Sequence, residues 1–295
     1  MGIHNCQDGV IKIENKKYPK ILRGIGKEAP KQLYYKGDIS LLQADCLAVV
    51  GSRRITTYGK QIVEKMVSQI ASAGVVVVSG FMYGVDAMAH KAAVEAGGRT
   101  IAVMPCGIER VHPEYQIKLY NDILESGGLV ISEYEGNMQP ALFTYPARNR
   151  IVAGLSKAVL VVEAAEKSGS LITAGLAEKF KRKLLAVPGP VNSIVSKGTN
   201  DLIKNRKAEM VLDADGILKY FGNRSTPSVK DAPTLGVEQV GPLENLILQK
   251  LRAEPMEIDI LARGLEKPIS ELSALLSIME IKDLIKNING KYHIN

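Results

Sequence analysis

The sequence predicts an α/β protein with a doubly wound, Rossmann-like, mostly parallel sheet and a small C-terminal winged-helix domain. Two observations predict this class. Short runs rich in Val, Ile and Leu alternate with helix-length amphipathic stretches from Leu47 to Phe221, which is the pattern of parallel βαβ units. Beyond residue 241, three helical stretches precede an Asn-Gly pair between two apolar-alternating runs, and Asn-Gly in such a place is the strongest short signal for a hairpin.

The predicted strands are almost purely apolar, as strands covered on both faces must be. They span residues 47–50, 75–78, 100–104, 129–132, 158–162, 184–187 and 210–212. The predicted helices between them span residues 58–73, 85–96, 116–125, 147–155 and 171–180, and several are followed by glycine, as helix C-termini often are. In the C-terminal part, helices are expected at 242–253, 258–264 and 270–281, and hairpin strands at 284–288 and 291–294.

Four segments are expected along the chain. Residues 1–40 would form an N-terminal extension that packs on the core, and residues 41–221 would form the Rossmann-like domain. From 222 to 241 the periodicity is lost and Ser, Thr, Pro and Gly accumulate, which is typical of a flexible linker. Residues 242–295 would form the winged-helix domain.

The distribution of charge indicates where a polyanion would bind. The net charge is +7 and the pI is near 9.1, which favours a polyanionic partner, with a solubilising surface excess as the alternative. Residues 241–295 carry seven Lys and Arg against eight Asp and Glu, a net charge of −1, which leaves +8 for residues 1–240. Electrostatic affinity for nucleic acid is therefore expected in the larger N-terminal part.

Composition excludes several classes of protein. A hydrophobic fraction of 46% and a charged fraction of 23% exclude a collagenous or wholly disordered chain. No stretch approaches the roughly 18 apolar residues of a spanning helix, and Met1–Asp8 lacks the apolar core of a signal peptide, so we expect an unexported cytoplasmic protein without a membrane anchor. Cys6, Cys46 and Cys106 are far apart and in no ligand spacing, so neither a disulfide framework nor a structural zinc is expected.

Small and basic residues follow several of the predicted strands. Residues 51–54 read GSRR, 79–81 read SGF and 167–170 read KSGS, while Arg148 and Arg150 fall beside the same edge. Ligands of doubly wound sheets bind at the carboxyl ends of the strands. Small residues there let backbone N–H groups approach an anion, and arginine suits bidentate contacts with phosphate. We therefore expect this edge to hold several phosphates, with simple tight turns as the alternative use of the glycines.

Two common nucleotide motifs are missing. No GxGxxG follows the first strand, and no GxxxxGK[ST] occurs in the chain. These absences disfavour a dinucleotide cofactor and P-loop nucleotide hydrolysis. The anion is expected to be something else.

A series of motifs runs in order through residues 18–212. It comprises YP (18–19), PKQLY (30–34), VVGSRR (49–54), VSGFMYGVDAMAH (78–90), TIAVMPCGIERVHP (100–113), ISE (131–133), YPARNRIVAGLS (145–156), VVEAAEKSGSLITA (161–174), LAVPGP (185–190) and KGTNDLI (197–203). In these motifs the chain resembles the DprA/Smf family of DNA-processing proteins. Many members begin with a helical domain, whereas 17 residues precede Tyr18 here, so we expect that domain's function to be absent or supplied elsewhere.

The resemblance implies a function as well as a fold. It implies a single-stranded DNA-binding protein, not an enzyme, that protects incoming single strands and helps to load RecA recombinase in natural transformation and recombination. It also implies a homodimer, with residues 41–221 as the DNA-binding domain and with neither cofactor nor metal.

The resemblance assigns the nucleic-acid-binding residues one by one. They are Gly51, Ser52, Arg53, Arg54, Ser79, Gly80, Phe81, Arg148, Asn149, Arg150, Lys167, Ser168, Gly169, Ser170, Thr173, Gly198, Thr199 and Asn200. Those that directly follow strands agree with the phosphate-binding edge described above. Within the motifs, Phe81 and Tyr145 are the candidates for stacking on bases.

Three other constellations stay open. Asp86 and His90, four residues apart on one predicted helix, could bind a metal, although no third ligand is evident and a role in packing or capping is the alternative. Glu133 and Glu163 are expected to end neighbouring strands and could form a carboxylate pair for acid/base chemistry, or else orient arginines. The basic run 179–183 could be a solvated helix face or a second phosphate track.

Two rival functions make testable demands on the sequence. A phosphoribohydrolase of the lysine-decarboxylase-like Rossmann group would carry a PGGxGTxxE stretch with a catalytic Glu, but residues 168–174 read SGSLITA and no acid follows Thr173 at the required spacing. A transcription factor acting through the winged helix would rely on phosphate neutralisation, which a segment with a net charge of −1 does not supply. We expect that segment to contact protein.

Overall fold

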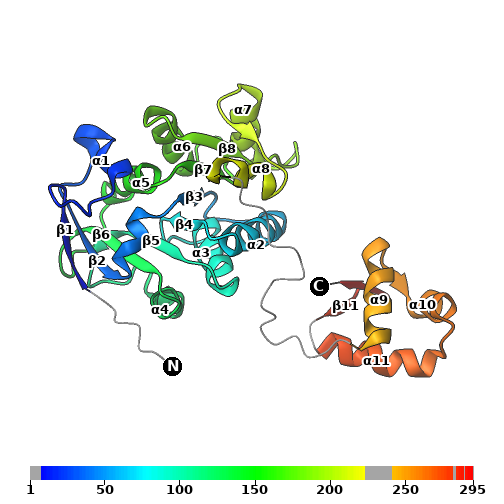
Figure 1. The fold of residues 1–295 in the computed structure, drawn as a ribbon. Coiled ribbons are helices and arrows are strands. Elements are labelled where there is room, and N and C mark those ends of the chain that lie inside the picture. The colour runs from blue at the N-terminus through cyan, green and yellow to red at the C-terminus, as the bar shows by residue number, and fades with distance from the viewer. Residues whose placement is uncertain (1–7, 223–240, 282–283, 289, 295) are drawn as a thin grey trace. The chain divides into compact units, whose positions relative to one another are not determined.

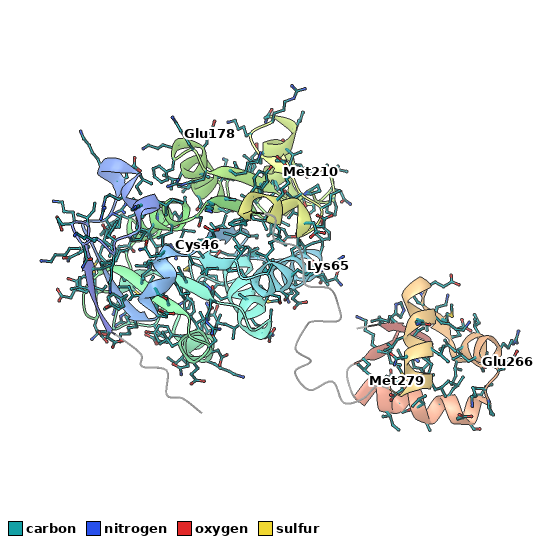
Figure 2. All side chains as sticks on the ribbon, in the orientation of Figure 1. Cys46, Lys65, Glu178, Met210, Glu266 and Met279 are labelled. Carbon is teal, nitrogen blue, oxygen red and sulfur yellow. The ribbon has the colours of Figure 1, made fainter. Side chains whose placement is uncertain are left out.

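The computed structural model describes residues 8–222, 241–281, 284–288 and 290–294. The chain divides into two units, Met1–Ala232 and Pro233–Asn295, each with a buried apolar core of its own. Figure 2 shows their side chains, with Cys46 buried in the larger unit and Met279 buried in the smaller one. The predicted linker, apart from Gly222 and Gly241, lies outside the described residues.

A nine-stranded sheet forms the centre of the larger unit (Figure 1), in the order β1-β2-β6-β5-β4-β3-β7-β8-β9. Its strands are β1 (Asp8–Lys12), β2 (Gln32–Gly37), β3 (Cys46–Val50), β4 (Val76–Ser79), β5 (Thr100–Gly107), β6 (Leu129–Tyr134), β7 (Ala158–Val161), β8 (Lys183–Ala186) and β9 (Glu209–Met210). Strands β3 to β9 are paired in parallel, whereas β1 and β2 form an antiparallel edge. The predicted fold class is confirmed, and each predicted strand is present.

Helices connect the parallel strands. They are α1 (Lys20–Arg23), α2 (Thr57–Ser72), α3 (Val85–Glu95), α4 (Ile117–Glu125), α5 (Thr144–Leu155), α6 (Ser170–Lys179), α7 (Lys197–Lys204) and α8 (Asp215–Leu218), with 3₁₀ turns at Gly26–Glu28, Ile39–Gln43, Glu114–Gln116, Ile194–Ser196 and Lys219–Phe221. The five predicted helices are confirmed as α2 to α6, and α1, α7 and α8 were not predicted. Within the described ranges, no helix has both the length and the apolar character needed to cross a membrane.

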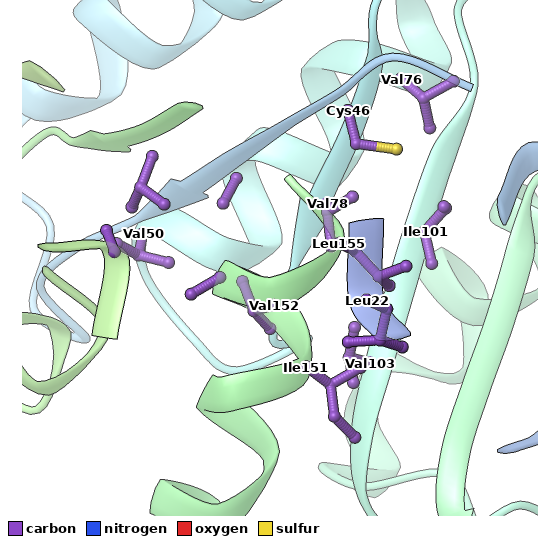
Figure 3. Packing of buried hydrophobic residues seen from close by; sticks show 14 of the residues in the cluster. Leu22, Cys46, Val50, Val76, Val78, Ile101, Val103, Ile151, Val152 and Leu155 are labelled. Atoms are coloured by element: carbon purple, nitrogen blue, oxygen red, sulfur yellow. The ribbon is translucent and has the colours of Figure 1, made fainter. Parts of the chain in front are cut away.

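The core lies in two layers because strand side chains alternate between the faces of the sheet. Ala48 and Val50 of β3 pack in the cluster that contains α5 and α6, whereas Leu47 and Val49 pack in the cluster that contains α2 and α3. Figure 3 shows the first layer, where Val50, Val78 and Val103 come from three strands of the sheet. Val78 and Val103 lie near Leu155 of α5 and Leu22 of α1, and Val50 lies at the other end of the layer. Covering both faces explains why the central strands are continuously apolar.

The N-terminal segment adds more than a packed extension. Its strands β1 and β2 extend the sheet beyond β6. Tyr18 and Leu22 are fully buried, and the Tyr18 hydroxyl donates to the Pro30 carbonyl at 2.8 Å. The Arg182 guanidinium donates to the carbonyls of Ile21 and Gly154, so it joins the segment to α5.

In the described part of the smaller unit, three helices accompany a three-stranded antiparallel sheet. Its elements are α9 (Pro242–Ala253), β10 (Met256–Glu257), α10 (Ile258–Leu265), α11 (Ile269–Ile281), β11 (Ile285–Ile288) and β12 (Lys291–Ile294), and the sheet order is β10-β12-β11. The predicted winged-helix fold is confirmed, and β10 is an addition. Asn289 of the predicted turn lies outside the described residues, and Gly290 beside it has a φ of +85°.

Candidate nucleic-acid interface

The strand order creates a crevice in the larger unit. From β3 the chain proceeds to β4, β5 and β6 on one side, then returns to place β7, β8 and β9 on the other side. Connections on the two sides of such a reversal diverge and leave a ligand site at the carboxyl ends of the strands. A pocket of about 920 Å³ lies there, lined by residues from segments 50–54, 80–86, 142–152, 165–173 and 194–195.

Two glycines fix the loop that follows β3. A Cβ on Gly51 would lie 2.6 Å from Val85 Cγ2 and 2.9 Å from the Glu163 carbonyl oxygen. Gly84 has a φ of +73°, and a Cβ there would collide with the Ser52 carbonyl, which accepts a hydrogen bond from the Val85 N–H at 3.1 Å. The loop is therefore held tightly against the start of α3.

Arg148 brings a buried positive charge to the pocket. The residue is 3% exposed, and its guanidinium donates to the carbonyls of Gly80 and Val103. Among the described residues, its Nε has no hydrogen-bond partner. Burial lowers the pKa of Arg148 to about 10, while the nearby Asp86 acts in the opposite direction, so the guanidinium remains charged at neutral pH.

The exposed arginines of the loop after β3 stand at the same pocket. The Arg53 guanidinium lies over the Tyr145 ring, 5.5 Å from its centroid, and the Tyr145 hydroxyl is hydrogen-bonded to His112 Nε2 at 2.9 Å. Within the described ranges, neither Arg53 nor Arg54 has an ion pair. The Glu163 carboxylate accepts hydrogen bonds from Thr56 and is not paired with Arg53.

The beginning of α6 supplies a second kind of positive field. Ser168, Gly169, Ser170 and Thr173 line the pocket, and the hydroxyls of the two serines lie 2.8 Å apart. A helix N-terminus carries unpaired N–H groups and about half a positive charge, both of which attract anions. This end of α6 therefore complements the arginines.

The rim of the pocket is apolar. Leu142 is 92% exposed, Ile194 is 80% exposed, and Ile172 and Tyr145 also line the opening. Among the described residues, the charged side chains of the lining are three arginines and one carboxylate, Asp86. Burial raises the pKa of Asp86. A cationic floor below an apolar rim can hold phosphate groups together with the faces of bases.

Comparison with known proteins places this site in a family. Residues 9–222 match the family described as DNA recombination-mediator protein A, and residues 231–291 match the DprA winged helix domain. The chain belongs to the DprA family.

Relatives in this family cover most of the chain. Protein Smf of Escherichia coli is 35% identical over 268 residues, which are 89% of this chain and 71% of Smf. The structure of DprA from Streptococcus pneumoniae has 39% identity and a TM-score of 0.68, and covers 72% of this chain and 74% of that one. A structure describing a single-stranded DNA binding mode of Helicobacter pylori DprA has 32% identity and a TM-score of 0.65, and covers 74% of this chain and 97% of that one.

Most of the residues assigned from the DprA resemblance meet in the pocket. Those that line it are Gly51, Ser52, Arg53, Arg54, Gly80, Arg148, Asn149, Ser168, Gly169, Ser170 and Thr173. They come from three strand-end loops and two helices that are far apart in the sequence. The expectation that strand ends converge explains this grouping.

Other assigned residues have structural contacts away from the pocket lining. The Ser79 hydroxyl donates to the Val49 carbonyl at 2.6 Å, and Ser79 is fully buried. Phe81 is also fully buried, with its ring near those of His90 and Tyr120. Phe81 is therefore wrong as a candidate for stacking on a base, whereas Tyr145 lines the pocket and stays a candidate.

Arg150 and Lys167 also lie outside the lining. Arg150 pairs with Glu133 at 2.6 Å. Lys167 is exposed in the loop between Ala165 and Ser168, two residues that do line the pocket. Lys167 is thus beside the opening of the pocket.

The GTN motif, Gly198 to Asn200, braces α7. The Gly198 N–H donates to the Ala164 carbonyl at 2.8 Å, and Thr199 is fully buried. The Asn200 amide exchanges hydrogen bonds with the backbone of Gly189 at 3.0 and 3.1 Å. These contacts fix the loops at Ala164 and Gly189, which follow β7 and β8.

The open constellations resolve differently. Glu133 and Glu163 do not end neighbouring strands, because β5, β4 and β3 lie between β6 and β7, so that expectation was wrong.

His90 Nδ1 is hydrogen-bonded to Thr100 Oγ1 at 2.7 Å, and the described residues contain no cluster of three metal-ligating side chains. In the basic run, Lys179 pairs with Glu28, and Lys183 pairs with Glu209 at 2.6 Å.

Several lining residues were not predicted. Tyr83, Leu142, Ile172 and Ile194 are aromatic or aliphatic side chains in loops and helix starts. The available signal in the sequence was the presence of apolar residues in loops and at helix starts. Such residues usually pack in a core, so the signal did not point to a binding site. Only the folded chain shows that four separate segments bring them to one rim.

Proposed function

We propose that the chain binds single-stranded DNA in the pocket at the carboxyl ends of β3, β4 and β7. Phosphates would contact Arg53, Arg54 and Arg148 and the beginning of α6. Bases would lie on Tyr145 and the apolar rim. Because phosphate contacts carry no direct sequence information, the binding would be largely independent of sequence.

The observation that carries this proposal is the buried guanidinium of Arg148. It is hydrogen-bonded to carbonyls rather than to a carboxylate, so its charge is only partly compensated by the nearby Asp86. A buried charge that is only partly compensated is costly, and an anion in the pocket would complete the compensation. A phosphate satisfies that requirement.

The form of the pocket favours a single strand. Apolar and aromatic side chains on the rim can contact base faces only when the bases are unstacked from a duplex. The single-stranded DNA binding mode of the related Helicobacter pylori protein supports the same choice.

The partners belong to the same proposal. The family description as a recombination mediator supports a role in protecting incoming single strands and loading RecA recombinase onto them. We also propose a cytoplasmic homodimer that acts without enzymatic turnover. Burial raises the pKa of Cys46 to about 12 and that of Cys106 to about 11, so neither thiol supplies a nucleophile at neutral pH.

A titration with matched oligonucleotides tests the function. Fluorescence anisotropy with single-stranded and blunt double-stranded DNA of equal sequence, at several salt concentrations, should show tighter binding of the single strand. Equal or tighter binding of the duplex would overturn the proposal. Incubation with nucleoside monophosphates should release no free base, and release would favour the phosphoribohydrolase.

A further inference from the structure

A second hollow lies beside the pocket, between α3 and α4. It has a volume of about 480 Å³ and is lined by residues 83–95 of the α3 segment and 115–122 of the α4 segment. Tyr83 lines both this groove and the pocket, so the two hollows share a wall. A ligand that leaves the pocket on this side must pass over Tyr83.

Aromatic rings mark that passage. Tyr83 stacks on Tyr115, with ring centroids 6.1 Å apart and an angle of 13° between the planes. Tyr115 is 70% exposed and Tyr83 is 40% exposed, so both rings are accessible to a ligand in the groove. With Tyr145 in the pocket, Tyr83 on the shared wall and Tyr115 in the groove, three tyrosines form a series from one hollow to the other.

A buried amide lies in the same groove. Gln116 lines the groove, is only 6% exposed, and has no hydrogen-bond partner for either Oε1 or Nε2 among the described residues. An unpaired buried amide is costly, and native proteins seldom keep one without a reason. A base edge carries both donors and acceptors, so it is a chemically suitable partner for this amide once it enters the groove.

The charges of the groove are balanced. Lys91 pairs with Glu95 of its own helix at 3.6 Å, and Lys118 and Asp122 also line the groove. The groove therefore lacks the excess of positive charge found in the pocket. Its aromatic and amide groups fit bases, with Lys118 as the one unpaired cation of the lining, within the described residues, that can meet a phosphate.

We propose that a single DNA strand held in the pocket continues over Tyr83 into the groove between α3 and α4, where bases stack on Tyr83 and Tyr115. This inference rests on the proposed single-strand binding and extends its footprint. The occupant is the same strand, because the shared wall at Tyr83 makes the groove continuous with the pocket.

Binding as a function of length tests the extension. Wild-type protein and the Tyr115→Ala and Tyr115→Phe variants would be titrated with oligothymidylates of about 4 and about 16 nucleotides, which bracket typical single-strand site sizes. Tyr115→Ala should weaken binding of the long strand by about tenfold, the order expected for loss of one stack, and leave the short strand unchanged. Tyr115→Phe keeps the ring and should bind both lengths like the wild type.

A second measurement reports on stacking itself. A long oligonucleotide with 2-aminopurine near one end, and another with it near the opposite end, would be bound to each variant. One of the two should be quenched by the wild type and by Tyr115→Phe, with the quenching relieved in Tyr115→Ala. Thermal unfolding should be unchanged, because the Tyr115 side chain is largely exposed.

The outcomes separate this inference from the proposed function. If Arg53→Ala weakens both lengths while Tyr115→Ala weakens neither and changes no quenching, the footprint is wrong and single-strand binding stands. The groove would then be free for a protein partner. If the wild-type protein binds neither length, or binds blunt duplex as tightly as the long single strand, the proposed function itself fails.

Discussion

Arg53 and Arg148 bring positive charge to the pocket in different ways. Arg148 is buried and held by carbonyls, whereas Arg53 is exposed and lies over the Tyr145 ring. The first charge is fixed when the chain folds. The second is free to close on a phosphate, so its removal should affect binding without affecting the fold.

Replacing Arg53 with Ala tests the exposed charge. The loss of a hydrogen bond to a charged group costs roughly 1.5 to 3 kcal/mol, so single-strand affinity should fall about ten- to a hundredfold. The slope of log K against log salt should become shallower by about 0.7, because one phosphate contact is lost. Titrations at several salt concentrations measure both changes.

Arg99→Ala is the matched control. Arg99 is exposed at the amino end of β5, away from the pocket, and its replacement removes the same charge. Affinity, salt slope and melting temperature should all stay near wild type. A lowered melting temperature for Arg53→Ala with an unchanged salt slope would instead assign Arg53 a role in bracing the sheet.

Asp86 is expected to oppose DNA binding when its carboxylate is charged. Burial raises the pKa of Asp86, so the folded state favours its protonated form. The protonated Asp86 carboxyl therefore contributes its full share to folding stability below the pKa that it has in the unfolded chain. This contribution is lost as the pH rises through the pKa that it has in the folded protein. The charged carboxylate, which dominates above the folded pKa, repels phosphate.

At a pH above the folded pKa of Asp86, the Asp86→Asn variant should therefore bind single strands about fivefold or more tightly than the wild type, since unit charges 4 Å apart interact by roughly 1 to 4 kcal/mol between water and a protein surface. Wild-type affinity should approach that of the variant as the pH falls toward the raised pKa. Burial lowers the pKa of His112, and this residue is present in both the wild type and the Asp86→Asn variant. Its effect on affinity therefore cancels when the two proteins are compared at the same pH. Weaker binding by Asp86→Asn would contradict this account of the pocket charge.

At the residue scale, the sequence predicted those pocket-lining residues that directly follow a strand or begin a helix. Residues 51–54 directly follow β3, and residues 168–170 lie at the start of α6. Such segments converge in a parallel sheet. Arg148 and Arg150 could not both face the pocket, because residues two apart on a helix point about 200° apart. Phe81 follows β4 but has a φ of +56°, and its ring enters the core.

Glu163 connects two elements. It lies just beyond β7, is 2% exposed, and accepts hydrogen bonds from the N–H and the hydroxyl of Thr56, the residue that caps α2. Through these bonds the end of a central strand fixes the start of a helix. The carboxylate therefore has a structural role at the edge of the site.

Glu163→Ala should lower the stability of the protein. Removing a buried partner leaves the Thr56 groups unpaired, which costs roughly 1 to 3 kcal/mol. Denaturant unfolding would measure this loss. The salt slope of DNA binding should not change, and a changed slope would mean that Glu163 acts on the bound phosphates.

Helix α11 has no Lys or Arg between Ile269 and Ile281, while it contains Glu271 and Glu280. Truncation after Phe221 should therefore leave single-strand affinity within a few-fold of the full chain, because counterion release scales with the phosphates neutralised. Titration of the two proteins in parallel measures this. Loss of most of the affinity would show that the smaller unit contributes to DNA binding.

Elements were predictable where the pattern was long and apolar. Strands β3 to β8 and helices α2 to α6 have buried faces that impose a period on the sequence. Strand β1 has four exposed residues in five, so it carries no apolar pattern. Helix α7 contains Gly198, which disfavours a helix locally, and packing against the loop at Ala164 overrides that preference.

At the scale of the whole molecule, charge and topology favour the same place. The net charge of residues 1–240 is +8 and that of residues 241–295 is −1. The reversal of strand order between β3 and β7 opens the larger unit at the strand ends, where three arginines line one pocket. The central claim is that a single strand lies there.

Photo-crosslinking with a bromodeoxyuridine-substituted single strand, followed by mass spectrometry of the crosslinked peptides, tests that claim most directly. The predicted crosslinks fall on the segments around 51–54, 80–86, 142–149 and 165–173, and they weaken in the Arg53→Ala variant. Crosslinks confined to residues 241–295, or to the amino ends of the parallel strands, would contradict it.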